Sequence, residues 1–315
     1  MQLLLYLPLL IPALGAAAAR PLAARLEPRA ATWLLTAATI GLAGCSTAAL
    51  ALLAASAAAR APVLAAMGHY SQHVVRRGDP VGAVTGIAAA LLLTAAAIAV
   101  AVTFRRRARA LAESFRRAGR LPEGGTIVVV PGEAIEAYAL PGWPGRIVVS
   151  GRLMNALDDE GRAALLAHER AHLAGQHHLF TTLAHLAAAA NPLLLPLANA
   201  VDYTVERWAD EHAARVTGNR RLVAATIGQV ALLAVPRPGR LPAAAFGIIR
   251  QRARRVSVAW AGPVPRRVAA LLAPPPRRRA ALLAAVALVL LLAGASAMEA
   301  ARDLHALLEL ARSTR

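Results

Sequence analysis

The feature that most constrains this chain is a set of four charge-free apolar runs, each close to the length of a membrane span. A helix needs about 20 residues to cross the ~30 Å hydrocarbon core of a bilayer. The four runs are 2–19, 31–59, 81–104 and 280–298. The composition agrees, because 57% of the 315 residues are hydrophobic and only 17% are charged, which is too apolar for an ordinary soluble domain. The sequence therefore predicts a mainly α-helical membrane protein with about four transmembrane helices.

Arginines beside the spans predict their orientation, since cytoplasmic loops are enriched in basic residues. The third run continues directly into RRRAR (105–109), and the fourth is preceded by PPPRRR (274–279). The segment between these two spans is therefore expected to be cytoplasmic. Removal of the first run as a signal peptide is an alternative that would reverse the predicted orientation of the remaining spans. That run ends in GAAAAR, but no positive residue precedes its apolar stretch.

The chain is strongly basic, with a formal net charge of +18. Such a balance occurs in proteins that bind nucleic acid and in proteins that contact anionic membrane surfaces. Aromatic residues make up only 4% of the chain and form no base-stacking pattern, so no nucleic-acid partner is expected. Membrane lipid is the expected partner of the arginines. The single cysteine, Cys45, excludes an internal disulfide and a thiolate zinc site.

Between the third and fourth runs the sequence changes character. Three short β-rich runs, 126–130, 136–140 and 146–150, are separated by Pro-Gly turns. They predict a small antiparallel sheet. The stretch LDDEGRAALLAHERAHLAGQ (157–176) follows, and its acidic beginning and good helix formers predict a helix.

A histidine cluster lies on that helix, in LLAHERAHLAGQHHLF (165–180). His168 and His172 are four residues apart, so about 400° of helical rotation brings both imidazoles to one face, where they can bind one ion. Glu169 lies about 100° away, within reach of a water at that ion but not in the ligand set. The alternative interpretation is a surface helix whose histidines face solvent.

Two residues compete as a third ligand, and they imply different enzymes. His178 completes HExxHxxGxxH together with Gly175, a metzincin pattern that also requires a methionine turn beneath the site. The only methionine after the helix is Met298, so that element is missing. Glu206, in TVERWADEHAA, instead completes a set of two histidines and one glutamate with an open fourth position for water. Asp210 follows one turn later and can orient a zinc-bound histidine.

These residues belong to a longer pattern, VVVPGEAIEAYALPG…RIVVSGRLMNALDDEGRAALLAHERAHLAGQHH…VERWAD, which covers about residues 126–214. It resembles the membrane-bound gluzincin metallopeptidases: the HtpX and CAAX prenyl protease group, and the related receptor peptidases that cleave β-lactamase repressors (metallopeptidase families forty-eight and fifty-six). The resemblance implies one Zn²⁺ per chain. The ligands it implies are His168, His172 and Glu206. It further implies Glu169 as the catalytic residue, Asp210 beside the ligands, and an edge strand for substrate at Ala137, Tyr138 and Ala139.

The expected fold is an α+β zincin-like protease domain, with a small antiparallel sheet and the HExxH helix, embedded in the helical membrane protein. Residues 1–104 are expected to form a membrane region with three transmembrane helices, and 105–276 a cytoplasmic zinc metallopeptidase domain. A fourth transmembrane helix at 277–298 and a short tail at 299–315 complete the division. The expected location is the bacterial cell membrane, which the chain crosses several times.

The expected function is hydrolysis of peptide bonds by a zinc-dependent metalloendopeptidase. Its partner is a protein or peptide substrate, and regulatory cleavage, with a transcriptional repressor as one candidate substrate, is the leading hypothesis. An HtpX-like quality-control protease is the alternative, favoured by the edge segment and by His177. A catalytically inactive membrane scaffold or receptor is a third hypothesis, against which the intact HExxH and ExxxD motifs argue.

One apolar segment, 179–200, tests this arrangement. It is long enough to resemble a further span, but a single crossing would put Glu206 on the opposite side of the bilayer from His168. Two crossings would need ~40 residues, almost twice the number available. The segment is therefore expected to make no net crossing, with Pro192 and Pro196 bending it.

Overall fold

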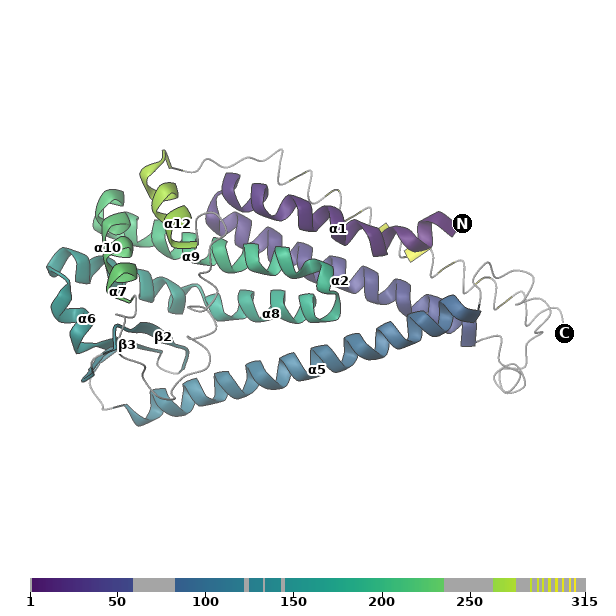
Figure 1. Cartoon of the computed structure of the whole chain (residues 1–315), viewed down its shortest axis with the longest axis horizontal. Coiled ribbons are helices and arrows are strands. Elements are labelled where there is room, and N and C mark those ends of the chain that lie inside the picture. The colour runs from purple at the N-terminus through teal and green to yellow at the C-terminus, as the bar shows by residue number, and fades with distance from the viewer. Residues whose placement is uncertain are drawn as a thin grey trace. The chain divides into compact units, whose positions relative to one another are not determined.

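The computed structural model describes residues 2–58, 83–121, 125–132, 134–142, 145–234 and 263–275, with isolated positions from 284 onwards. The chain divides into two units. The first holds residues 1–109, 179–202 and 277–315, and the second holds 110–178 and 203–276. Figure 1 labels most of the helices and strands of both units. Most of the expected fourth span, 280–298, lies outside the described residues.

Long apolar helices make up the first unit. They are α1 (Gln2–Arg25), α2 (Pro28–Ala58) and the greater part of α5 (Ala83–Arg120). Glu27 accepts hydrogen bonds from the backbone N–H groups of Arg29 and Ala30, which caps the N-terminus of α2. Gly86 lets α5 approach α2, because a Cβ at this position would lie 1.9 Å from the Cβ of Ala57.

Two of these helices are long and apolar enough to cross a membrane, among the residues that the structure describes. They are Pro28–Ala58, with mean hydropathy 1.8, and Val84–Arg120, with mean hydropathy 2.5. Only 6% of the most apolar window of the second is buried, so its apolar side chains have little protein around them. The finding indicates membrane association, and it falls short of the four spans that the sequence predicts.

The apolar segment 179–200 folds back on itself. It contains α8 (His177–Ala190), a turn of 3-10 helix, η1 (Pro192–Leu194), and the start of α9 (Leu195–Thr217). Asn191 accepts a hydrogen bond from Leu193 N–H and donates one to Ser46 on α2. On the two arms, His185 Nε2 lies 3.0 Å from Asp202 Oδ2. The segment is therefore a helical hairpin, whose second arm returns in the direction from which the first arm came.

The second unit contains a three-stranded sheet. Its strands are β1 (Ile127–Val130), β2 (Ala137–Leu140) and β3 (Arg146–Ser150), in the order β1-β3-β2. β2 pairs with β3 antiparallel, but β1 pairs with β3 parallel. The expectation of an antiparallel sheet is therefore wrong for one of the two pairings. Strands that follow one another usually pair, but here β3 takes the centre because its side chains are buried on both faces, as Ile147, Val148 and Val149 show.

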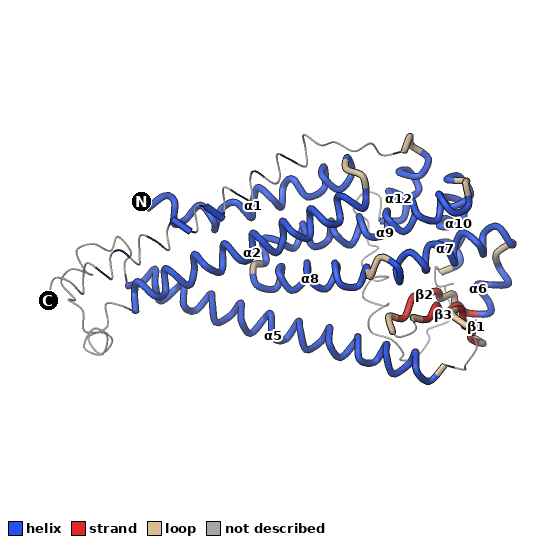
Figure 2. Tube along the Cα trace, turned by 180° about the vertical axis from the view of Figure 1, so that it is seen from behind, coloured by secondary structure: helices blue, strands red, loops and turns tan. Residues whose placement is uncertain are grey.

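Helices cover this sheet and continue the unit, and Figure 2 shows the strands beside α7. They are α6 (Gly151–Ala156), α7 (Asp159–Ala174), the second half of α9, α10 (Arg220–Leu233) and α12 (Pro263–Leu272). The side chain of Asp158 accepts a hydrogen bond from Gly161 N–H at 2.8 Å and caps α7. The inner face of the sheet packs on α7 through Ile147, Val149 and Leu165. The N-cap at Asp158 and the packing against the buried strand β3 fix the position and rotation of α7.

Candidate metal centre

Two histidines on α7 face one another. The Nε2 atoms of His168 and His172 are 3.1 Å apart, as their spacing of one helical turn predicts. Both side chains are largely buried, with 13% and 19% of their surface exposed. The solvated-helix interpretation of these histidines is therefore wrong.

Glu206, on α9, completes a group of three with these histidines. Its Oε2 lies 3.7 Å from His168 Nε2, and its Oε1 lies 3.9 Å from His172 Nε2. One ligand atom from each of the three residues lies within 4.8 Å of the others. Tetrahedral zinc with bonds of 2.0–2.2 Å places its ligand atoms about 3.3 Å apart. The three atoms have close to the spacing that such an ion requires.

The outer ring nitrogens of the two histidines have partners of their own. His168 Nδ1 lies 3.0 Å from Asp210 Oδ1, and His172 Nδ1 lies 3.0 Å from His177 Nδ1. A proton on each of these outer nitrogens leaves both Nε2 lone pairs directed into the same gap. Two lone pairs 3.1 Å apart repel one another unless a cation lies between them. The donor set therefore fits a metal ion.

Asp210 is almost fully buried and strongly held as an anion. Burial alone would raise its pKa, but the charge and hydrogen bonds of Arg267, with His168 beside it, lower the pKa of Asp210 below its usual value. Burial lowers the pKa of His168, but the hydrogen bond and charge of Asp210 outweigh burial and raise the pKa of His168 above its usual value. Asp210 thus fixes the orientation of His168, the role that a carboxylate has behind a metal-binding histidine.

Arg267 is a site residue that the sequence interpretation missed. It lies on α12, 12% exposed, with Nη1 2.9 Å from Glu206 Oε2 and Nη2 2.6 Å from Asp210 Oδ1. In the sequence it stands in the arginine-rich region before the fourth apolar run, where arginines are expected to mark the cytoplasmic side of a span. A usable signal was its place on a short amphipathic helix, one residue before Val268 and four before the buried Leu271.

Glu169 lies beside this group and is 8% exposed. Burial raises the pKa of Glu169, and a hydrogen bond from the backbone of Ala139 partly opposes that rise. A carboxylate with a raised pKa can both accept and return a proton near neutral pH. The contact also joins the edge strand β2 to the histidine helix.

His177 lies behind the pair, against His172 and the ring of Trp208. Burial lowers the pKa of His177 to about 4 and that of His172 to about 3. Both rings are therefore neutral at pH 7. Gly175 leaves room for His177, because a Cβ on it would lie 2.4 Å from His177 Nε2.

The rival third ligand, His178, is not among the residues brought together with His168 and His172. It follows His177 on α8, and burial lowers its pKa. The metal-candidate group found among the described residues contains Glu206 in its place. The geometry therefore favours two histidines and a glutamate over the metzincin set.

Ala137, Tyr138 and Ala139 lie on β2, which is at one edge of the described sheet. Ser150 N–H on β3 donates to Glu136 O, and backbone groups alternate in direction along an antiparallel strand. The N–H and C=O groups of Ala137 and Ala139 therefore point away from β3. The Ala139 N–H is already bonded to Glu169, so the groups that this edge presents to a further chain are the N–H and C=O of Ala137 and the C=O of Ala139.

Comparison with known families gives one match. The model of Peptidase family M48 matches residues 101–275, more than half of the chain, including every residue of the group just described. Comparisons with curated proteins and with solved structures gave no match.

Proposed function

Because the chain belongs to peptidase family M48, we propose that it is a zinc metalloendopeptidase of the cell membrane that cleaves protein or peptide substrates. The family is one of metallopeptidases, so a peptidase activity follows from membership. The observation that supports zinc is the group of His168, His172 and Glu206, whose ligand atoms lie within 4.8 Å of one another. Three protein ligands leave a fourth position open, as catalysis requires.

The proposed mechanism assigns each residue a separate task. His168, His172 and Glu206 would hold the ion, which when bound lowers the pKa of a water molecule and polarises the scissile carbonyl. Glu169 accepts a proton from the attacking water on its carboxylate and delivers it to the leaving amine nitrogen. Its buried position supports this role, because burial raises the pKa of Glu169 and so makes the carboxylate a stronger base.

Substrate would bind as an added strand. The N–H and C=O of Ala137 and the C=O of Ala139 point away from β3, and the Ala139 N–H donates to Glu169. An extended peptide paired to this edge would pass beside the candidate base. Pairing through the backbone selects an unfolded or extended chain more than a particular sequence.

The experiment compares the full chain, purified in detergent, with Glu169→Gln on fluorescently labelled unfolded casein. The proposal predicts hydrolysis that a chelator abolishes, that added zinc restores, and that Glu169→Gln lowers by about 10²- to 10⁴-fold. Equal hydrolysis by both proteins would remove Glu169 from the mechanism. Absence of both zinc and hydrolysis would favour the inactive scaffold or receptor.

The finer substrate proposal is a regulatory protein, with a transcriptional repressor as one candidate and damaged membrane proteins as the alternative. Glu169→Gln serves as a trap, because it keeps the proposed ligands while slowing turnover. Co-purification of one small protein with the trap in cells would support regulatory cleavage. A broad set of misfolded membrane proteins would support quality control.

The topological proposal is a multi-pass protein whose 105–276 domain is cytoplasmic. It is supported by the apolar exposed face of α5 and by the arginines 105–109 that follow it. A reporter that fluoresces only in the cytoplasm, fused after Arg120, is expected to be bright. A dark fusion with normal expression would place the domain on the other side.

A further inference from the structure

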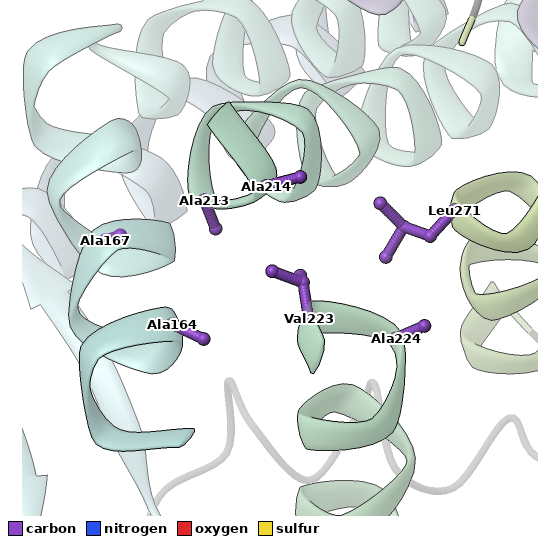
Figure 3. Close-up of a cluster of buried hydrophobic side chains, with 7 residues drawn as sticks. All are labelled: Ala164, Ala167, Ala213, Ala214, Val223, Ala224 and Leu271. Carbon is purple, nitrogen blue, oxygen red and sulfur yellow. The ribbon is translucent and has the colours of Figure 1, made fainter. Parts of the chain in front are cut away.

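The short helix α12 is attached to α9 and α10 at two polar points separated by an apolar contact. Arg267, near its middle, binds Glu206 and Asp210. Arg220, at the start of α10, binds its C-terminal end. Between them Leu271 is 3% exposed. Figure 3 shows Leu271 directed towards α9 and α10, close to Ala214 and Ala224.

Arg220 uses two of its three guanidinium nitrogens at the end of α12. Its Nε donates to Leu271 O at 3.0 Å, and its Nη2 donates to Ala270 O at 2.9 Å and to Ala273 O at 3.2 Å. These are terminal carbonyls that have no partner within the helix. A cation in this position also interacts favourably with the negative end of the helix dipole. Arg220 therefore acts as the C-terminal cap of α12.

The remaining nitrogen of Arg220 ties the cap to α9. Its Nη1 forms an ion pair with Glu211 Oε2, and both side chains are mostly buried, at 22% and 17% exposed. Glu211 follows Asp210 directly in the sequence. Two adjacent acidic residues of α9 therefore each bind an arginine that holds α12 in place. Asp210 binds Arg267 of α12, and Glu211 binds Arg220, which caps α12.

The geometry of Arg267 depends on where α12 sits. Its Nε and Nη2 donate to the two oxygens of Asp210, and its Nη1 reaches Glu206. A bidentate arginine–carboxylate pair tolerates little displacement. Arg267 lies one turn before Ala270 and Leu271, whose carbonyls Arg220 holds, so a shift of that helix end would move Arg267 away from the carboxylates.

We propose that Arg220 is a positioning residue for the metal centre: by capping α12 it holds Arg267 against Glu206 and Asp210, and so fixes one proposed ligand and the carboxylate behind another. The inference rests on the proposed function. It assigns Arg220, remote from the ligands, an effect on metal affinity that passes through Arg267. Removal of groups that orient ligands typically weakens metal binding about 10- to 100-fold.

The test is a double-mutant cycle read as zinc affinity, without any assay of hydrolysis. The full chain in detergent is titrated with zinc against a coloured chelator, as wild type, Arg220→Gln, Arg267→Gln and the double variant. We expect Arg220→Gln to weaken zinc binding about tenfold, and the double variant to bind no more weakly than Arg267→Gln alone. The neighbouring Arg221→Gln, which changes an exposed side chain on the same turn of α10, is the matched control and should bind as wild type.

The outcomes separate the two proposals. If the wild type binds no zinc, the proposed function fails. If the wild type binds zinc and Arg220→Gln binds equally well, or if the two substitutions weaken binding additively, the positioning role is overturned. Should Arg220→Gln not fold, Arg220→Lys decides, since lysine keeps the charge but cannot reach the same set of acceptors. It is expected to weaken zinc binding several-fold, and unchanged affinity would contradict the proposal.

Discussion

Arg267 and Asp210 form a two-bonded ion pair in the interior of the second unit, with Nε 2.7 Å from Oδ2 and Nη2 2.6 Å from Oδ1. The pair joins helices 57 residues apart in sequence. Burial lowers the pKa of Arg267, but the charges of Glu206 and Asp210 outweigh that effect and raise it. Asp210 in turn contacts His168. One buried arginine therefore balances the acidic groups on which the candidate metal centre is built.

Arg267→Gln is predicted to destabilise the fold as well as the site. The substitution leaves Asp210 buried at 1% exposure without its cation, and breaking a buried pair in this way costs about 3–5 kcal/mol. Chemical unfolding of the chelator-treated protein in detergent measures the loss. The control is Arg266→Gln, whose guanidinium lies over the ring of Tyr203 at 4.2 Å and contributes about 0.5–1 kcal/mol. Equal effects of the two substitutions would contradict the account.

Gly175→Ala is predicted to displace His177. The backbone at Gly175 is ordinary, with φ −83°, so the obstacle is space: the new methyl group would lie 2.4 Å from His177 Nε2 and 3.0 Å from Ala171 O. Overpacking of this kind costs about 1–3 kcal/mol. Gly228→Ala, where nothing lies within 4 Å of the added Cβ, should be neutral or stabilise α10 by up to about 1 kcal/mol. A Gly175→Ala protein as stable as Gly228→Ala would show that His177 has room to move.

The metal-free protein is predicted to lose stability as the pH falls below about 6.5. Burial lowers the pKa of His177 to about 4, whereas in the unfolded chain it is about 6.5. Above pH 6.5 both states are neutral at this residue. Between pH 6.5 and 4 the unfolded state binds a proton that the native state does not, so the free energy of unfolding decreases as the pH is lowered.

From pH 7.5 to pH 5 the titration of His177 lowers the free energy of unfolding by about 2 kcal/mol. Unfolding free energies at several pH values, for the wild type and His177→Gln, measure it. The variant should show the shallower decline, with His172 accounting for part of what remains. Parallel curves for the two proteins would mean that His177 is protonated as easily in the native state as in the unfolded one.

Ala137→Pro is predicted to weaken substrate binding while keeping the sheet. Proline removes the backbone N–H that points away from β3, and it is tolerated at the first residue of an edge strand. Loss of one hydrogen bond to substrate corresponds to about a fivefold to tenfold rise in KM. The comparison is Tyr138→Pro, at a position whose backbone faces β3, which should destabilise the fold. An unchanged KM for Ala137→Pro would argue against substrate pairing along this edge.

The local chemistry of the site could be predicted from sequence because it depends on helical spacing. Four residues separate His168 from His172 and Glu206 from Asp210, and a regular helix turns that spacing into a shared face. The thickness of a bilayer predicted that the segment 179–200 turns back between the two motifs. The helical hairpin with its turn at Pro192–Leu194 agrees with that prediction. The sequence also predicted the family, which the match to residues 101–275 confirms.

The rest depends on contacts between distant parts of the chain. The parallel pairing of β1 with β3 has no local signal, because neighbouring strands in a sequence could equally form a meander. Arg267 binds a carboxylate 57 residues away, and its sequence neighbourhood suits a membrane-flanking arginine just as well. A buried arginine and a surface arginine look the same in a sequence, and only the packing of α12 shows that Arg267 is buried.

The most direct test of the proposed metal site is the zinc content of the detergent-purified wild type beside Glu206→Ala and His178→Ala. A site made of His168, His172 and Glu206 predicts about one zinc per chain in the wild type, loss with Glu206→Ala and retention with His178→Ala. Zinc lost with His178→Ala and kept with Glu206→Ala would contradict the glutamate site and restore the metzincin set.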